Sequence, residues 1–157
     1  MGGLIHTRVE SPVGALLLVS NGLAIVSISF GGTPPDGSVE SRAGFEEAVD
    51  QLNAYFARQL REFTLPLEPQ GTPFQLRVWQ ELRAIPYGET RSYSEVAKAI
   101  GRPGSVRAVG AANGANPLPI VVPCHRVIGA DGSLTGFGGG LPAKRFLLDL
   151  ESLKFAF

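Results

Sequence analysis

The chain has 157 residues, of which 44% are hydrophobic and 18% are charged, a composition that supports a buried core and excludes a disordered chain. No apolar run approaches the roughly 20 residues that a membrane-spanning helix needs, and the chain does not begin with the charged and then apolar segments of a secretory signal. The single cysteine excludes an internal disulfide and is typical of a reducing compartment, so we expect a cytoplasmic protein without a membrane anchor.

The formal net charge is zero, yet the two halves of the chain carry opposite charge. Residues 1–72 contain four Lys or Arg and eight Asp or Glu, whereas residues 73–157 contain ten and six. A basic half suits phosphate binding, although an excess of this size is also common on ordinary solvated surfaces. The sign changes at a proline-rich segment, so we expect a first lobe at 1–63, a connection at 64–72 and a second domain at 73–157.

The first lobe shows the pattern of a small antiparallel sheet covered by a helix. The predicted strands lie at residues 7–10, 15–19 and 23–30. Asn21-Gly22, between the last two, is a strong hairpin signal. After a loop rich in glycine and proline, Phe45, Val49, Leu52 and Phe56 recur every three or four residues, as on one face of a helix. We expect that helix to cover the sheet.

Capping signals predict three helices at the start of the second domain. Thr72 with Pro73 starts the first, Ser92 with Glu95 forms a capping box for the second, and Ser105 opens the third. The second and third helices, joined by a short turn with proline and glycine, match a helix-turn-helix, although an ordinary helical hairpin has the same pattern.

The third helix carries small residues along much of its length, with Arg107 as its one long side chain. A slim helix can approach DNA closely, and Arg107 could act on DNA as a probe or a phosphate clamp. Few of its side chains can read base edges, which disfavours a sequence-specific transcription regulator.

Cys124 lies between Pro123 and His125 in an apolar run. Such a thiol is either an inert part of the core or a nucleophile, and the adjacent imidazole favours the second without deciding between them. One cysteine and two histidines are too few for an ordinary structural zinc site, so we expect no metal. Asn116-Pro117 leads from the third helix toward Cys124; Asn116 is either a turn residue or a lock between that helix and the cysteine turn.

The segment Thr135–Gly140 is rich in glycine but lacks the spacing of a dinucleotide fingerprint or a Walker loop. Its backbone either comes close to a ligand or forms a flexible turn.

Residues 73–157 resemble the O6-alkylguanine-DNA alkyltransferases, a family of DNA repair proteins. The residues that carry the resemblance are Tyr87-Gly88-Glu89-Thr90, Ser92-Tyr93, Arg107-Ala108-Val109-Gly110, Asn116-Pro117, Pro123-Cys124-His125-Arg126-Val127-Ile128-Gly129, Gly136-Phe137-Gly138-Gly139-Gly140 and Glu151. The front lobe matches more loosely. The resemblance implies an α+β fold with two lobes: a ribonuclease H-like antiparallel sheet with a covering helix, and a mostly helical C-terminal domain with a helix-turn-helix.

The resemblance also implies a function. The protein would be a single-turnover methyltransferase that moves the alkyl group irreversibly from O6-alkylguanine, and less efficiently from O4-alkylthymine, to Cys124. It would dock in the minor groove of double-stranded DNA, flip the damaged base out of the duplex, need no cofactor, and act as a monomer that could cluster on DNA.

By position, four residues would be catalytic. Glu151 would orient His125, which would take the Cys124 proton through a water, and Tyr93 would donate a proton toward guanine N3. The implied base-binding residues are Asn116, Val127, Phe137, Gly138 and Lys144. The implied DNA-binding residues are Ser92, Tyr93, Ser105, Arg107 and Ala108. In detail, the carbonyls of Cys124 and Val127 would face the exocyclic amine, the Gly138 amide would face O6, and Arg107 would fill the gap left by the base.

Two features depart from the family pattern. Phe137 stands where a tyrosine is usual, so we expect slightly altered base or inhibitor preference with activity retained. The front lobe has no cysteine to form the zinc site of some relatives, so metal dependence is not expected. Two alternatives remain: a non-catalytic sensor of alkylated guanine, although such relatives lack the cysteine, and a cysteine hydrolase, which would leave the basic helix-turn-helix unexplained.

Overall fold

The computed structural model describes residues 3–152, and the chain folds as two compact units, Met1–Pro69 and Gln70–Phe157. The last five residues of the expected second domain lie outside the described residues. None of the described helices is long and apolar enough to cross a membrane.

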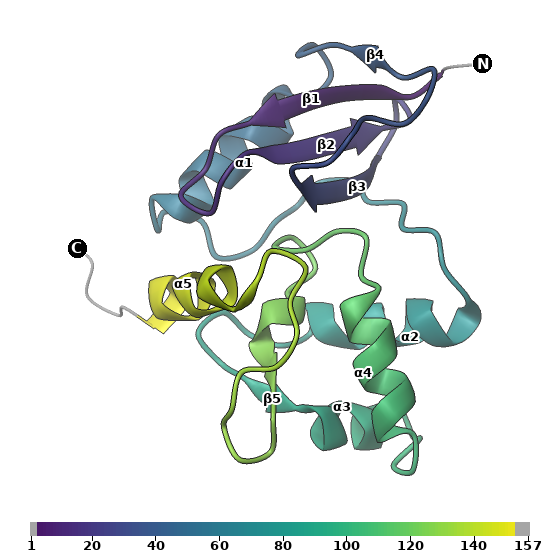
Figure 1. Ribbon diagram of the computed structural model, residues 1–157, viewed down its shortest axis with the longest axis vertical. Helices are drawn as coiled ribbons and strands as arrows, with labels where there is room; N and C mark the ends of the chain where they lie inside the picture. The colour runs from purple at the N-terminus through teal and green to yellow at the C-terminus, as the bar shows by residue number, and fades with distance from the viewer. Residues whose placement is uncertain (1–2, 153–157) are drawn as a thin grey trace. The chain divides into compact units, whose positions relative to one another are not determined.

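The first unit is a four-stranded sheet with one helix (Figure 1). Its elements are β1 (Ile5–Val9), β2 (Leu16–Ser20), β3 (Ile25–Phe30), β4 (Val39–Glu40) and α1 (Glu46–Phe56). The strand order is β3-β2-β1-β4, with antiparallel pairing of β1, β2 and β3, as expected. The short β4, which the sequence pattern did not predict, pairs with β1 in parallel.

The expected hairpin between β2 and β3 is confirmed. The Asn21 side chain caps its turn, because Oδ1 accepts from the amides of Leu23 and Ala24 at 2.9 Å, and Gly22 adopts a φ of +93° that suits glycine. All of β2 is buried, so it forms the centre of this unit's core.

The helix of the first unit buries part of the face that was expected, since Phe45, which directly precedes it, and Leu52 are almost fully buried. Ala48, Leu52 and Tyr55 are its buried residues, whereas Val49 and Phe56 are only half-buried. The periodicity identified the helix correctly, but the step of 3.6 residues per turn places Tyr55 on the face of Ala48 and Leu52. Beyond α1, Leu65 is buried, and Ile25 donates to the Pro66 carbonyl at 2.9 Å, which attaches the start of the expected connection to β3.

The second unit is mostly helical (Figure 1). Its helices are α2 (Pro73–Arg83), α3 (Tyr93–Ala99), α4 (Val106–Gly114), the 3₁₀ helix η1 (Cys124–Arg126) and α5 (Leu141–Ser152). Two short strands, β5 (Arg91–Ser92) and β6 (Val127–Ile128), pair in parallel. This pairing brings the start of α3 beside the residues that follow η1.

Local capping explains where α2 and α3 begin. The Thr72 and Ser92 side chains each accept a hydrogen bond of 3.1 Å from the backbone amide three residues further on. The side chains of Gln75 and Glu95 in turn accept from the backbone amides of Thr72 and Ser92, which completes a capping box at each helix start. Ser105 precedes α4 as expected, but its side chain makes no capping hydrogen bond.

The helix-turn-helix α3–α4 packs on α2. The Trp79 indole nitrogen donates to the Ala112 carbonyl at 2.8 Å, a buried bond between α2 and α4. Val96 and Ala97 of α3, with Val109 of α4, are almost fully buried. The opposite face of α4 is left to solvent.

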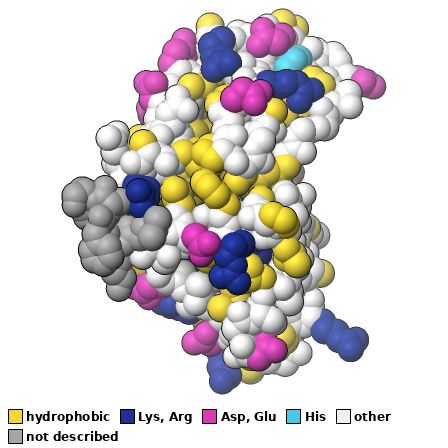
Figure 2. All heavy atoms as spheres, turned by 60° about the vertical axis from the view of Figure 1, so that its left-hand side comes forward, with side chains coloured by type: hydrophobic (Ala, Val, Ile, Leu, Met, Phe, Trp, Pro, Cys, Tyr) yellow, Lys and Arg dark blue, Asp and Glu magenta, His cyan; other side chains and the backbone are white. Residues whose placement is uncertain are grey.

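The excess of basic residues in the second half does not form one continuous patch in the view of Figure 2. There, Lys and Arg side chains are separated by acidic side chains and uncharged surface.

Candidate active site

The Cys124 thiol lies at the start of η1 and is 5% exposed. Two tight turns directly precede it in the chain and set its position. The Val122 amide donates to the Leu118 carbonyl at 2.8 Å, and the Cys124 amide donates to the Val122 carbonyl at 2.7 Å. The second bond closes an inverse γ-turn about Pro123, whose φ of −80° and ψ of 65° match that turn.

The Asn116 side chain braces these turns from the end of α4. Its Nδ2 donates to the Val122 carbonyl, and its Oδ1 accepts from the Leu118 amide, both at 2.9 Å. Asn116 therefore makes the local turn and also holds the backbone two residues before Cys124.

The same loop contains a strained residue. Ile120 is 1% exposed and has a φ of +75°, a conformation that is costly for a β-branched side chain. The surrounding hydrogen bonds and burial hold the backbone of this loop in the strained conformation.

The environment keeps the resting thiol protonated. Burial raises the pKa of the Cys124 thiol, and the Asn116 side chain and the Lys144 charge oppose that effect only in part. Because only a thiolate is strongly nucleophilic, reaction at Cys124 needs a base.

His125 has the features of such a base. Its side chain is fully buried, and Nε2 lies 2.7 Å from the Glu151 carboxylate. Burial would by itself raise the pKa of Glu151, but hydrogen bonds from His125 and Arg126, with the guanidinium charge, lower it to about 2. An ionised carboxylate accepts hydrogen bonds only, so Nε2 carries the proton of the imidazole.

The remaining ring nitrogen of His125 is therefore unprotonated. Burial lowers the pKa of His125, which keeps the ring neutral near pH 7. Among the described residues, its Nδ1 has no hydrogen-bond partner. A neutral imidazole with one nitrogen fixed by a carboxylate and the other free is the arrangement of a general base.

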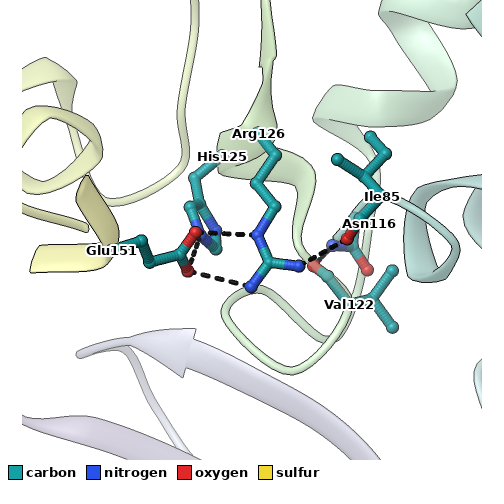
Figure 3. Close-up of polar contacts among 6 residues, drawn as sticks. All are labelled: Ile85, Asn116, Val122, His125, Arg126 and Glu151. Carbon is teal, nitrogen blue, oxygen red and sulfur yellow. Dashed lines mark hydrogen bonds and ion pairs between the residues drawn. The ribbon is translucent and has the colours of Figure 1, made fainter. Parts of the chain in front are cut away.

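Arg126 completes this buried cluster, and sequence reasoning gave it no role. Its Nε donates to one Glu151 oxygen at 2.8 Å and a terminal nitrogen donates to the other at 3.0 Å (Figure 3). The other terminal nitrogen donates to the Ile85 carbonyl at 2.7 Å, and the guanidinium lies 5.7 Å from the centre of the Tyr87 ring. In the sequence, Arg126 stands out only as the residue after His125, because its partner Glu151 lies 25 residues further along the chain.

Lys144 fixes the glycine-rich segment to β6. Its Nζ donates to the carbonyls of Val127 and Thr135, each at 2.7 Å, and the side chain is fully buried. Burial lowers the pKa of the Lys144 amine. Lys144 was expected among the base-binding residues. Its amine instead donates to two backbone carbonyls, one of which is that of Val127, another residue expected to bind the base.

A cavity of about 510 Å³ opens between the helix-turn-helix and the glycine-rich segment. It is lined by Tyr93, Val106, Gly110, Asn113, Gly114, Thr135, Gly136, Phe137 and Gly138. The Tyr93 hydroxyl and the Thr135 hydroxyl are 2.7 Å apart, which joins its two sides. Three of the expected site residues, Tyr93, Phe137 and Gly138, therefore meet at one cavity.

Asn113 connects this cavity to Cys124, and sequence reasoning missed it. The side chain is 4% exposed, lines the cavity and donates through Nδ2 to the Cys124 carbonyl in a long hydrogen bond of 3.4 Å. It is in the same helix as Arg107, and only its burial distinguishes it from a surface asparagine.

The expected DNA-binding residues lie on or beside the helix-turn-helix. Arg107 and Ala108 are exposed on α4, and Arg107 makes no hydrogen bond or ion pair with the described residues. The Ser92 hydroxyl accepts the capping bond from the Glu95 amide, and Ser105 is half-exposed at the start of α4. Within residues 3–152, no group of three His, Cys, Asp or Glu side chains is placed to hold a metal ion.

Comparison with known proteins connects this arrangement to one family. The family model for the DNA-binding domain of 6-O-methylguanine DNA methyltransferase matches residues 73–153, and that for its ribonuclease-like domain matches residues 4–69. The methylated-DNA–protein-cysteine methyltransferase of Mycobacterium tuberculosis is 52% identical over an alignment of 159 residues, gaps included, that covers 94% of this chain and 93% of that protein. The protein of the same name from Methanosarcina acetivorans is 53% identical over 147 residues, covering 90% and 94%. The crystal structure of Mycobacterium tuberculosis OGT in complex with DNA has a TM-score of 0.90 and 52% identity, and covers 94% of this chain and 92% of that one.

Proposed function

The chain belongs to the 6-O-methylguanine DNA methyltransferase family, and from this premise we propose that it repairs DNA by transferring an alkyl group from O6-alkylguanine to Cys124 in one irreversible turnover. The observation that carries the proposal is the buried Glu151–His125 pair at 2.7 Å, which leaves an unprotonated His125 nitrogen in the residue next to the only thiol. We assign both DNA binding and alkyl transfer to residues 73–157.

The chemistry is a displacement at the alkyl carbon. His125 Nδ1 takes the thiol proton through a water, and the Cys124 sulfur attacks the carbon in line with the bond to O6. The sulfur–carbon bond forms as the carbon–oxygen bond breaks, and the electron pair moves onto the guanine. Tyr93 donates a proton toward guanine N3, so the leaving base departs neutral. Solvent then carries a proton from His125 back to Tyr93, and the guanine proton moves from N3 to N1, so the net products are S-alkylcysteine and unmodified guanine.

The cavity supports this pathway as the place for a flipped base. Phe137 offers a ring as a wall, and the exposed backbone of Gly138 offers an amide toward O6. Lys144, through its bond to Thr135, supports the segment that carries both residues. The same cavity would admit O4-alkylthymine, with fewer hydrogen bonds and a slower reaction.

DNA binding is assigned to α4 in the minor groove. Small, exposed residues such as Ala108 allow the helix to approach the duplex, and Arg107 is free to enter the stack in place of the flipped nucleotide. We propose that Ser92 and Ser105, at the starts of α3 and α4, contact backbone phosphates. We further propose a cytoplasmic monomer, able to cluster on DNA, that uses neither metal nor cofactor.

The direct test is intact mass after incubation with an oligonucleotide that contains O6-methylguanine. The expected result is one added methyl group on Cys124, absent from Cys124→Ala, with no second turnover. Many products per protein molecule would indicate a hydrolase instead, and tight binding without a mass change would indicate a sensor.

The role of Arg107 has its own test. Arg107→Ala should slow repair of duplex DNA much more than reaction with free O6-benzylguanine, because the free base needs no flipping. Lys98→Ala, which removes one exposed positive charge from the neighbouring helix α3, is the matched control. Equal losses on both substrates for Arg107→Ala would refute the intercalating role.

A further inference from the structure

Asn113 has an amide oxygen that the fold does not use. Its Oδ1 is buried and has no hydrogen-bond partner among the described residues. A buried polar atom left unpaired in this way costs stability, so an unpaired one beside a site is a candidate for ligand binding.

The orientation of the amide follows from its neighbour. Nδ2 donates to the Cys124 carbonyl. If the amide were turned over, two oxygens would face each other, so the unpaired atom is the acceptor Oδ1 and not the donor. The ligand group that satisfies Asn113 must therefore be a hydrogen-bond donor.

Asn113 also lies at the right place. It lines the cavity with Tyr93, Phe137 and Gly138, and it contacts the backbone of Cys124. A base that enters this cavity far enough to present its alkyl group to the thiol comes beside the Asn113 side chain.

Two backbone carbonyls near the thiol already accept hydrogen bonds. The Cys124 carbonyl accepts from the Val127 amide in η1 and from Asn113, and the Val127 carbonyl accepts from Lys144 at 2.7 Å. The Val127 carbonyl keeps a second lone pair, whereas Oδ1 of Asn113 has both lone pairs free.

An O6-alkylguanine offers one kind of donor on its base. Alkylation of O6 removes the proton from N1, and N9 is bonded to the sugar, so only the 2-amino group can donate. We propose that Asn113 is a specificity-determining residue, whose Oδ1 accepts a hydrogen bond from the 2-amino group of the bound purine. This inference rests on the proposed alkyl transfer, and it adds a side-chain contact that selects the guanine nucleus.

The test compares two free bases that differ only in that group, O6-benzylguanine and 6-benzyloxypurine. The rate of benzyl transfer to Cys124 is measured by intact mass for the wild-type protein and for Asn113→Leu, which has a similar volume and no hydrogen-bonding atom. The preference of the wild-type protein for O6-benzylguanine should fall about tenfold in Asn113→Leu, because the purine amine then enters without its acceptor. Intrinsic reactivity differences between the two purines cancel in this double comparison.

Two more variants separate specificity from packing. Asn113→Asp, protonated at this buried position, keeps an acceptor and a donor, so it should retain most of the preference. Val106→Ala changes the lining of the same cavity without a hydrogen-bonding group, so it should alter both rates by the same factor. If Asn113→Leu and Asn113→Asp both slow the two purines equally, Asn113 acts through packing alone and the inference is wrong. If Asn113→Leu does not fold, Asn113→Ala takes its place: loss of the preference in Asn113→Ala with its retention in Asn113→Asp would support the inference, and an unchanged preference in Asn113→Ala would overturn it.

The outcome for the wild-type protein distinguishes this inference from the function on which it rests. Benzyl transfer with an unchanged preference in the folded Leu variant overturns the role of Asn113 and leaves the proposed function intact. Absence of benzyl transfer from both purines overturns the proposed function, and the role of Asn113 with it.

Discussion

Removal of the Arg126 side chain should destabilise the second unit far more than removal of an exposed arginine. In Arg126→Met, the Glu151 carboxylate stays buried but loses both hydrogen bonds from the guanidinium. The Glu151 pKa of about 2, against an ordinary value of 4.5, corresponds to about 3 kcal/mol of unfolding free energy, to which His125 and the Arg126 guanidinium both contribute. Breaking a buried ion pair from one side typically costs about 3–5 kcal/mol, so we expect a loss in this range.

Urea unfolding followed by the fluorescence of Trp79 measures this loss. Trp79 is the only tryptophan and lies buried in α2, so its signal reports the unit that contains Arg126. Arg77→Met is the matched control, because Arg77 pairs with Glu81 at an exposed site and should contribute less than about 1 kcal/mol.

The pH dependence of the unfolding free energy tests the same cluster independently. A carboxyl whose pKa is lowered by folding stabilises the protein above its unfolded pKa of 4.5, and this stability is lost as the pH falls toward 2. Arg126→Met raises the pKa of Glu151, so its unfolding free energy should change less over that range than that of the wild-type protein.

The double variant Arg126→Met/Glu151→Gln completes the experiment. It removes both charges, so it should be more stable than the sum of the two single losses indicates. A loss below about 1 kcal/mol for Arg126→Met, or strict additivity in the double variant, would refute the account of the buried cluster.

Three further predictions follow from particular residues. The rate of benzyl transfer to Cys124 should vary little between about pH 6.5 and 8, because the lowered pKa of His125 keeps its ring unprotonated in that range. In His125→Gln, which lacks the base, the rate should rise about tenfold per pH unit with the fraction of thiolate. Equal pH profiles for the two proteins would exclude His125 as the base. Ile120→Gly should unfold at a urea concentration no lower than that of Ile120→Ala, because the φ of +75° at this position favours glycine by about 1 kcal/mol. A Gly variant clearly less stable than the Ala variant would argue against backbone strain at Ile120. Gly71→Ala should cost about 1–3 kcal/mol and shift the tryptophan emission, because its Cβ would lie 2.6 Å from the Trp79 ring; an unchanged spectrum and urea midpoint would contradict this packing.

The sequence predicted the features that depend on short-range chemistry. Thr72 and Ser92 mark helix starts, because a capping box involves residues only three positions apart. The hairpin at Asn21-Gly22 was equally predictable, since the turn selects its own residues. The family resemblance added Glu151 as a partner of His125, which no local pattern could indicate.

Features that depend on distant contacts were not predictable. The Arg126–Glu151 pair joins η1 to α5, and the unpaired oxygen of Asn113 becomes visible only when every neighbour has been placed. The short parallel strand β4 was missed because two residues carry no periodicity. The pattern placed Leu52 correctly on the buried face of α1 but chose Phe56 instead of the adjacent Tyr55, because apolar residues occur on more than one side of that helix.

The glycines of the cavity wall have a consequence for how this protein can change over evolution. A Cβ added at Gly136 or Gly138 would meet no atom within 4 Å, whereas the loop that presents Cys124 holds Ile120 in a strained and fully buried conformation. Alanine at either position would therefore displace none of the residues that stabilise the fold. A change confined to these glycines can thus alter the shape of the cavity while the loop that holds the nucleophile stays unchanged.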